Sequence, residues 1–160
     1  MNIYKKLFGN LDEAERLIKS SRGMVEVAVE ILEEPKAMMR VLENLDGAIR
    51  LSISSILQYE YVIGKVKLSK KYDENMNRFF RSSVKYGLTK KDKMNMKKLL
   101  LISGKHRESG FEFSKNKEMF MMMNDEVYRF GLKECKVFIK TAEKLLKNVK
   151  KIAKYPRRKV

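Results

Sequence analysis

The sequence predicts an all-α fold, an antiparallel bundle of four to five main helices with a small β-hairpin before the last helix. Three observations carry this prediction. Apolar residues recur three and four positions apart in long segments, which places them on one face of a helix. Proline and glycine separate those segments, and polar capping residues stand at their starts. The 160 residues suffice for one domain with a full core, which we expect at 1–155, followed by a basic tail at 156–160.

The segment from Asn44 to Leu68 is the least charged part of the chain and is predicted to be the central helix. Apolar residues occupy more than one side of this helix, so we expect other helices to contact it on several sides. The preceding segment either joins it in one helix over residues 35–69 or is separated from it by a break near Asp46 and Gly47. The break is considered because glycine costs about 1 kcal/mol inside a helix. The apolar seam consists of Leu45, Ile49, Ser52, Ile56, Tyr59, Ile63 and Val66.

Two helical segments are predicted before the central helix. Residues 2–9 form a short helical turn that ends at Gly9. Asn10 then caps the first long helix, and Glu13 stands three residues later, as in a capping box. Pro35 ends this helix and begins the next, because proline is tolerated at a first helical position.

The segments after the central helix alternate between helix and turn. Residues 73–86 are predicted to form a helix that ends at Gly87. Thr89 and Asp92 cap the next helix, which is predicted to extend to His106. The glycine- and serine-punctuated residues 103–118 are interpreted as the end of this helix followed by a loop.

The last part of the sequence is predicted to form a hairpin and a helix. Two apolar runs flank the turn-forming pair Asn124-Asp125, which favours a β-hairpin, with a helix as the competing interpretation. The closing helix covers residues 132–155, and lysines fill the side opposite its apolar line. That apolar line is Cys135, Phe138, Ala142, Leu145, Val149 and Ile152.

The charge of the chain is large and unevenly distributed. The 36 basic and 20 acidic residues give a net charge of +16. Residues 1–34 carry 5 basic and 7 acidic side chains, whereas residues 65–117 carry 16 and 5, and residues 132–160 carry 11 and 2. Such an excess of positive charge favours RNA or another polyanion as the partner.

Several function classes find no support in the sequence. No apolar run approaches the length of a membrane span, and the first ten residues lack the apolar core of a signal peptide, so we expect a cytoplasmic protein without membrane contact. A single cysteine excludes a disulfide within the chain. One cysteine and one histidine together are too few for a structural zinc site, which needs four cysteine or histidine ligands. No glycine-rich nucleotide fingerprint or phosphate loop occurs. We therefore expect no metal and no cofactor.

The basic residues after the central helix are candidates for phosphate contacts. We select five of them as a predicted nucleic-acid-binding set. Lysines of the last helix form a second basic face, although helix C-termini favour cations for structural reasons as well. The predicted contacts are Arg78, Arg81, Lys85, Lys105 and Arg107.

His106 is the one side chain expected to titrate near neutral pH, and Lys105 and Arg107 flank it. RNA cleavage without a metal needs such a group beside cations that stabilise the developing phosphate charge. His106 and Arg107 are therefore the candidate catalytic residues. The alternative is an exposed or capping histidine at a helix end.

Residues 11–153 resemble the HEPN superfamily of small prokaryotic helical-bundle proteins, and more closely its uncharacterised archaeal members. The specific part is the run over residues 104–146, in which a His-basic-Glu-Ser segment precedes an aromatic stretch, a hairpin and the closing helix. The resemblance implies a bundle that dimerises, with RNA cleavage or toxin and antitoxin roles among the activities of the superfamily. Nuclease members carry an arginine with four to six residues between it and a histidine, and here Leu99, Leu100 and Leu101 occupy the corresponding positions before His106.

The sequence thus predicts a homodimeric, HEPN-like protein that binds RNA and lacks a clear catalytic signature. Two alternatives stay open. One is a metal-independent ribonuclease or toxin in which His106 moves the proton. The other is a non-enzymatic, antitoxin-like bundle that binds a protein partner through its methionine-rich hairpin or its acidic N-terminal helix.

Overall fold

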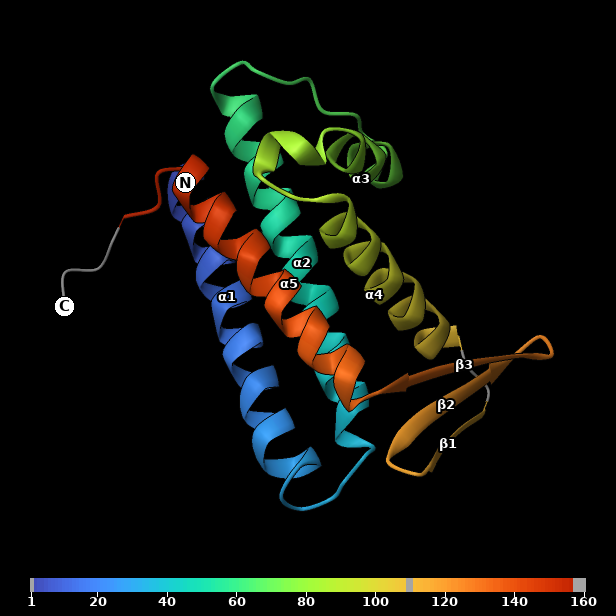
Figure 1. The fold of residues 1–160 in the computed structure, drawn as a ribbon. Coiled ribbons are helices and arrows are strands. Elements are labelled where there is room, and N and C mark those ends of the chain that lie inside the picture. Colours follow the sequence, from blue (N-terminus) through green and yellow to red (C-terminus); the bar gives the residue numbers. More distant parts are fainter. Residues whose placement is uncertain (1, 109–110, 157–160) are drawn as a thin grey trace.

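The protein is described by a computed structural model that covers residues 2–108 and 111–156. In this part of the chain, five α-helices form a bundle, and a three-stranded sheet projects from one end of it (Figure 1). The helices are α1 (Ile3–Met24), α2 (Ala37–Val62), α3 (Tyr72–Arg81), α4 (Lys90–Glu108) and α5 (Leu132–Ile152). The strands are β1 (Phe111–Lys115), β2 (Glu118–Met123) and β3 (Glu126–Gly131). The mainly helical prediction is confirmed, and the sheet is larger than the predicted hairpin.

Helix α1 is a single helix, so the predicted break at Gly9 is wrong. Asn2 caps the start of the helix, and its side-chain oxygen accepts a hydrogen bond from the Tyr4 amide at 3.0 Å. Leu7 and Leu11, on either side of Gly9, are both fully buried. Their burial, worth about 1.5–3 kcal/mol each, outweighs the cost of about 1 kcal/mol of one helical glycine.

The chain turns between α1 and α2. A π-helical turn over Val25–Val29 ends the first helix, and α2 begins two residues after Pro35. Helix α2 then continues through Gly47, where an added side chain would meet the Leu17 side chain of α1 at 3.3 Å. Of the two alternatives for this segment, the continuous helix is therefore the correct one, and Gly47 lets α1 and α2 approach closely.

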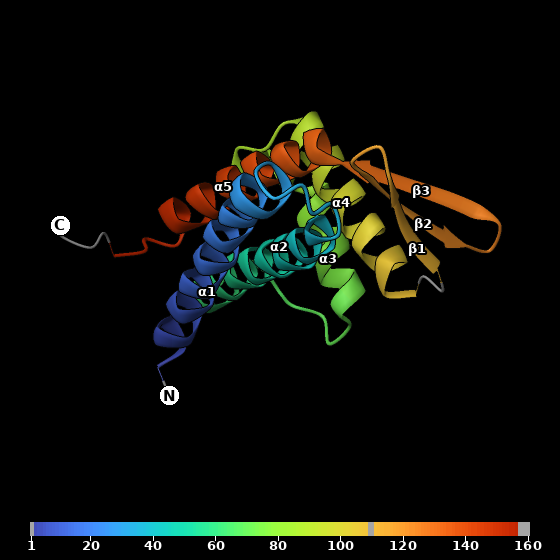
Figure 2. The ribbon, with the colours of Figure 1, turned by 90° about the horizontal axis from the view of Figure 1, so that it is seen from below.

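Helix α2 is the central helix, as predicted. It contacts α1, α4 and α5, and its seam residues Leu45, Ile49 and Ile56 are buried (Figures 1 and 2). The helix ends at Val62 and not at Leu68. Ile63, at its C-cap, is 41% exposed, and the backbone at Gly64 is left-handed with φ 76°.

The predicted capping of α4 is confirmed, but the α-helix predicted over residues 73–86 ends at Arg81. Helix α3 is followed by a 3-10 turn over Ser83–Tyr86 and by Gly87, which has a left-handed φ of 71°. At the start of α4 the Thr89 amide donates to the Asp92 carboxylate at 2.9 Å. The Asp92 amide donates in return to the Thr89 hydroxyl at 3.1 Å.

The region after α4 differs most from the prediction. Helix α4 ends at Glu108, close to the predicted end at His106, so His106 and Arg107 lie in its last turn. Residues 111–115 form strand β1, which pairs with β2 in antiparallel register. The hairpin of β2 and β3 is confirmed, with Asn124 and Asp125 in its turn at φ 49° and 64°.

Helix α5 closes the bundle with its predicted apolar line inward. Cys135, Phe138, Leu145 and Val149 are buried within the chain. The homodimer that the resemblance implies therefore needs a surface other than the buried apolar lines of α2 and α5. None of the described helices is long and apolar enough to cross a membrane. Of the predicted tail, residues 157–160 lie outside the described residues.

Candidate nucleic-acid interface

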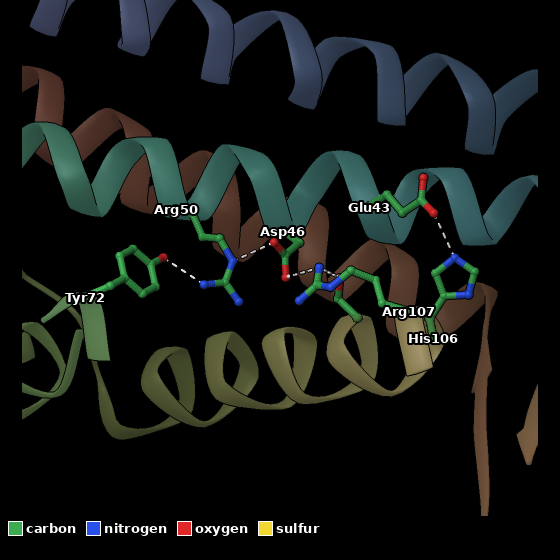
Figure 3. A network of polar contacts seen from close by, with 7 residues as sticks. Glu43, Asp46, Arg50, Tyr72, His106 and Arg107 are labelled. Atoms are coloured by element: carbon green, nitrogen blue, oxygen red, sulfur yellow. Dashed lines mark hydrogen bonds and ion pairs between the residues drawn. The ribbon is translucent and has the colours of Figure 1, made fainter. Parts of the chain in front are cut away.

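His106 joins three elements of the fold. It lies in the last turn of α4, and its side chain is 15% exposed. Its Nε2 atom lies 2.8 Å from the Glu43 carboxylate of α2, as Figure 3 shows. Its Nδ1 atom forms a hydrogen bond with the Glu112 carboxylate of β1. The ring therefore connects the sheet to the central helix.

The two carboxylates decide the charge of His106. Burial alone would lower the pKa of the imidazole, but its hydrogen bonds with Glu43 and Glu112 and their negative charges raise the pKa above the ordinary value. When the ring is protonated, both nitrogens donate to these carboxylates. A ring held in this way favours a positioning role, because taking a proton from a substrate requires one carboxylate to move away.

Arg107 belongs to a second cluster, built around a buried carboxylate. Asp46 of α2 is 4% exposed and binds Arg50 Nε at 2.7 Å. Its second oxygen, Oδ2, has no hydrogen-bond partner among the described residues and lies 3.7 Å from Arg107 Nη1. Arg107 also donates to Ser103 Oγ at 3.2 Å, and Arg50 donates to the Tyr72 hydroxyl at 2.7 Å (Figure 3). Two guanidinium groups from α2 and α4 thus converge on one buried charge.

We call these contacts the α2–α4 polar network. The carboxylates of the network balance much of its positive charge. Its ion pairs and hydrogen bonds therefore mainly connect α2 to α4. The arginine side chains remain 32% and 53% exposed, and they keep N–H groups that can bind a phosphate. The network comprises Glu43, Asp46, Arg50, Tyr72, Ser103, His106, Arg107 and Glu112.

The predicted phosphate contacts fall into two groups. Arg78 and Arg81 lie on α3 and line one small hollow, where Arg78 donates to the backbone carbonyl of Lys67. Lys85 lies in the following turn, and its ammonium group pairs with the buried carboxylate of Glu60. Lys85 therefore has a structural partner inside the fold.

The other two predicted contacts lie at the far end of α4. Lys105 and Arg107 are in its last turn, next to the sheet, whereas α3 lies near its start (Figure 1). The Lys105 ammonium group is 5.6 Å from the centre of the Tyr128 ring. The structure therefore does not bring all five residues into one surface.

A different surface collects basic residues in one place. A groove of about 1300 Å³ runs between α1 and α5, which lie side by side (Figures 1 and 2). Seven basic and two acidic residues line it, together with three apolar or aromatic residues. We call it the α1–α5 groove. Its lining comprises Glu15, Ile18, Lys19, Arg22, Glu143, Lys144, Leu146, Lys147, Lys150, Lys151, Lys154 and Tyr155.

Ion pairs divide the basic residues of the groove. Arg22 pairs with Glu143, Lys150 lies 3.2 Å from Glu15, and further pairs engage Lys19 and Lys144. Lys147, Lys151 and Lys154 have no ion-pair partner in the described part of the chain, and all three are exposed. These three lysines are therefore available to an external anion.

Sequence reasoning found only part of these sites. The lysines of the last helix were recognised as a basic face, but α1 as the opposite wall was not. Asp46 and Arg50 were also missed, although two charged residues four positions apart in the least charged segment are a usable signal.

Comparison with known proteins identifies no relative. No protein-family model, no curated protein and no solved structure matches this chain. The resemblance to the HEPN superfamily therefore stays a prediction. The residues with a described position contain no group of three or more His, Cys, Asp or Glu side chains that could hold a metal ion.

Proposed function

We propose that this protein binds nucleic acid, with RNA as the form that its resemblance to the HEPN superfamily implies. The α1–α5 groove is the observation that carries the proposal. It concentrates seven basic residues, and three of them have no ion-pair partner among the described residues. Phosphates bound at these lysines would neutralise them, and the polyanion would release counterions; both effects favour binding.

The spacing of the groove lysines on α5 suits a phosphate backbone. Lys147 and Lys151 are four positions apart in α5, so they share one helix face. Lys154 lies two residues beyond the end of the helix at Ile152, in a left-handed conformation with φ 55°. Four residues at the helical rise of about 1.5 Å span about 6 Å along the axis. One strand of a duplex carries about two phosphates over that length, so Lys147 and Lys151 can contact neighbouring phosphates.

The test compares two triple variants of equal net charge. In the first, Lys147, Lys151 and Lys154 are replaced by glutamine. In the control, glutamine replaces three exposed lysines of the segment between α2 and α3, Lys65, Lys67 and Lys70. Binding of labelled single-stranded RNA and DNA is measured over a range of salt concentrations.

We expect the groove variant to bind RNA more weakly and to lower the log-log salt slope by about 2, because each lost phosphate contact contributes about 0.7 on a single strand. The control should keep the wild-type slope. Equal losses in both variants would show that net charge alone drives binding, and would refute the groove. A variant in which glutamine replaces Arg78 and Arg81 tests the predicted contacts on α3 in the same assay.

Metal-independent RNA cleavage is the second candidate, because His106 carries a raised pKa and lies next to Arg107. Labelled structured RNA is incubated with wild type and with His106→Ala in the presence of EDTA. Under the binding proposal both samples shift the RNA and leave it intact. Cleavage by the wild type that disappears in the variant would identify an enzyme. RNA that stays unbound and intact would favour a protein partner.

A further inference from the structure

The sheet has one face that no described helix covers. Side chains alternate between the two faces of a strand. Met119, Met121 and Phe130 are buried on the side of the sheet that faces the bundle. The alternate residues therefore point away from it, and Figures 1 and 2 show the sheet projecting beyond the helices. We call this the outer face of the sheet, formed by Phe113, Lys115, Glu118, Phe120, Met122, Val127 and Arg129.

Aromatic and basic groups lie in one row across this face. Phe113, Phe120 and Arg129 are register partners on β1, β2 and β3. The rings of Phe113 and Phe120 are stacked, with centres 5.1 Å apart and planes at 8°. The side chain of Arg129 is 63% exposed, and its guanidinium lies 3.7 Å from Glu118. The row thus places flat apolar surface beside a guanidinium group.

A second row extends the apolar area. Met122 and Val127 are register partners and are 40% and 56% exposed. Lys115 and Lys117 lie at the end of the sheet where β1 turns into β2. Lys117 lies 3.7 Å from Glu33, and Glu118 on the outer face pairs with Arg129. The outer face is therefore apolar in its middle, with three cations and the Glu118 carboxylate at its borders.

The occupant of this face has to suit both properties. A second copy would bring together two chains of net charge +16, which repel each other. Aromatic rings and guanidinium groups are the side chains on which unpaired bases stack, while neighbouring cations hold the phosphates. A single strand supplies both the bases and the negative charge.

We infer that the outer face of the sheet binds the unpaired bases of single-stranded nucleic acid, with Phe120 as the stacking residue and Arg129 beside it. This inference rests on the proposed nucleic-acid binding and specifies its substrate as single-stranded. Bases in a duplex are stacked on their own neighbours, so a duplex gains nothing from Phe120.

The test measures binding of oligouridylate and of its duplex with oligoadenylate. Phe120→Ala should weaken binding of oligouridylate by about 5- to 150-fold, which corresponds to the loss of one base–aromatic stack. Phe120→Leu keeps apolar volume without the ring, and it should weaken binding of oligouridylate by a similar factor. This variant serves as the test if Phe120→Ala alters the fold. Binding of the duplex should stay at the wild-type level. Tyr61→Ala, which removes a 56% exposed aromatic ring from α2, is the matched control.

The outcomes separate this inference from the function on which it rests. If the wild type binds neither nucleic acid, the proposed function fails, and this inference with it. If the wild type binds oligouridylate and both Phe120 variants bind it equally well, only the stacking site is refuted. A change in oligomeric state on replacing Phe120, with unchanged RNA affinity, would assign the face to a second copy and also overturn the inference.

Discussion

The buried carboxylate of Glu60 provides a quantitative test of the fold. Glu60 lies near the end of α2 and is 2% exposed. The Tyr86 hydroxyl donates a hydrogen bond to it, and Lys85 pairs with its other oxygen. Tyr86→Phe removes only the hydroxyl, since the ring stays stacked on Phe79 with centres 4.9 Å apart. The substitution leaves the buried Glu60 Oε1 atom without the hydrogen bond from this hydroxyl.

A hydrogen bond to a charged group contributes about 1.5–3 kcal/mol to stability. We therefore expect Tyr86→Phe to lower the free energy of unfolding by that amount and the Tm by about 3 to 12 °C for a chain of this length. Urea unfolding followed by circular dichroism measures the first quantity, and a thermal scan measures the second.

The control for this substitution is Tyr61→Phe, which removes a hydroxyl from a tyrosine that is 56% exposed. Its effect should stay within about 0.5 kcal/mol, as for ordinary surface substitutions. A Tyr86→Phe protein as stable as the control would refute the reasoning, because the Glu60 carboxylate would then be satisfied without the hydroxyl.

Two further predictions concern pH and backbone geometry. The pKa of His106 is raised in the folded chain above its ordinary value of 6.5, so its contribution to stability is complete below that value and is lost as the pH rises through the folded pKa. In unfolding experiments between about pH 6 and about pH 9, His106→Gln should remove this decline, and an unchanged pH dependence would contradict the contacts with Glu43 and Glu112. Gly87→Ala should destabilise the protein by about 1–2 kcal/mol, because an L-residue is strained at φ 71° and its Cβ would lie 3.1 Å from Asn148 Nδ2. An alanine variant with wild-type stability in urea would show that this turn can relax.

Features that depend on neighbours in the sequence were predicted well. Thr89 and Asp92 cap α4 across three residues, and Asn124 and Asp125 turn the hairpin. The apolar lines of α2 and α5 are buried as their spacing indicates, because the period of a helix is a local property.

The errors occur where a contact with a distant segment decided the outcome. Gly9 reads as a helix end, but the burial of Leu7 and Leu11 against other helices keeps α1 continuous. Residues 111–115 read as a loop, and they become a strand because β2 offers a partner for pairing. Neither the packing of Leu7 and Leu11 nor the pairing of β1 with β2 can be predicted from the composition of the local segment.

The same distinction separates the charge of this protein from its candidate sites. The sequence alone determined the net charge of +16, its concentration after residue 64 and the basic face of the last helix. Only the tertiary structure decided that α1 forms the second wall of a groove, that Lys85 is engaged by Glu60, and that His106 meets Glu43 across 63 residues of chain. Charge is a sum over residues, whereas a site requires side chains from remote segments to lie within a few ångströms, and helix packing sets those distances.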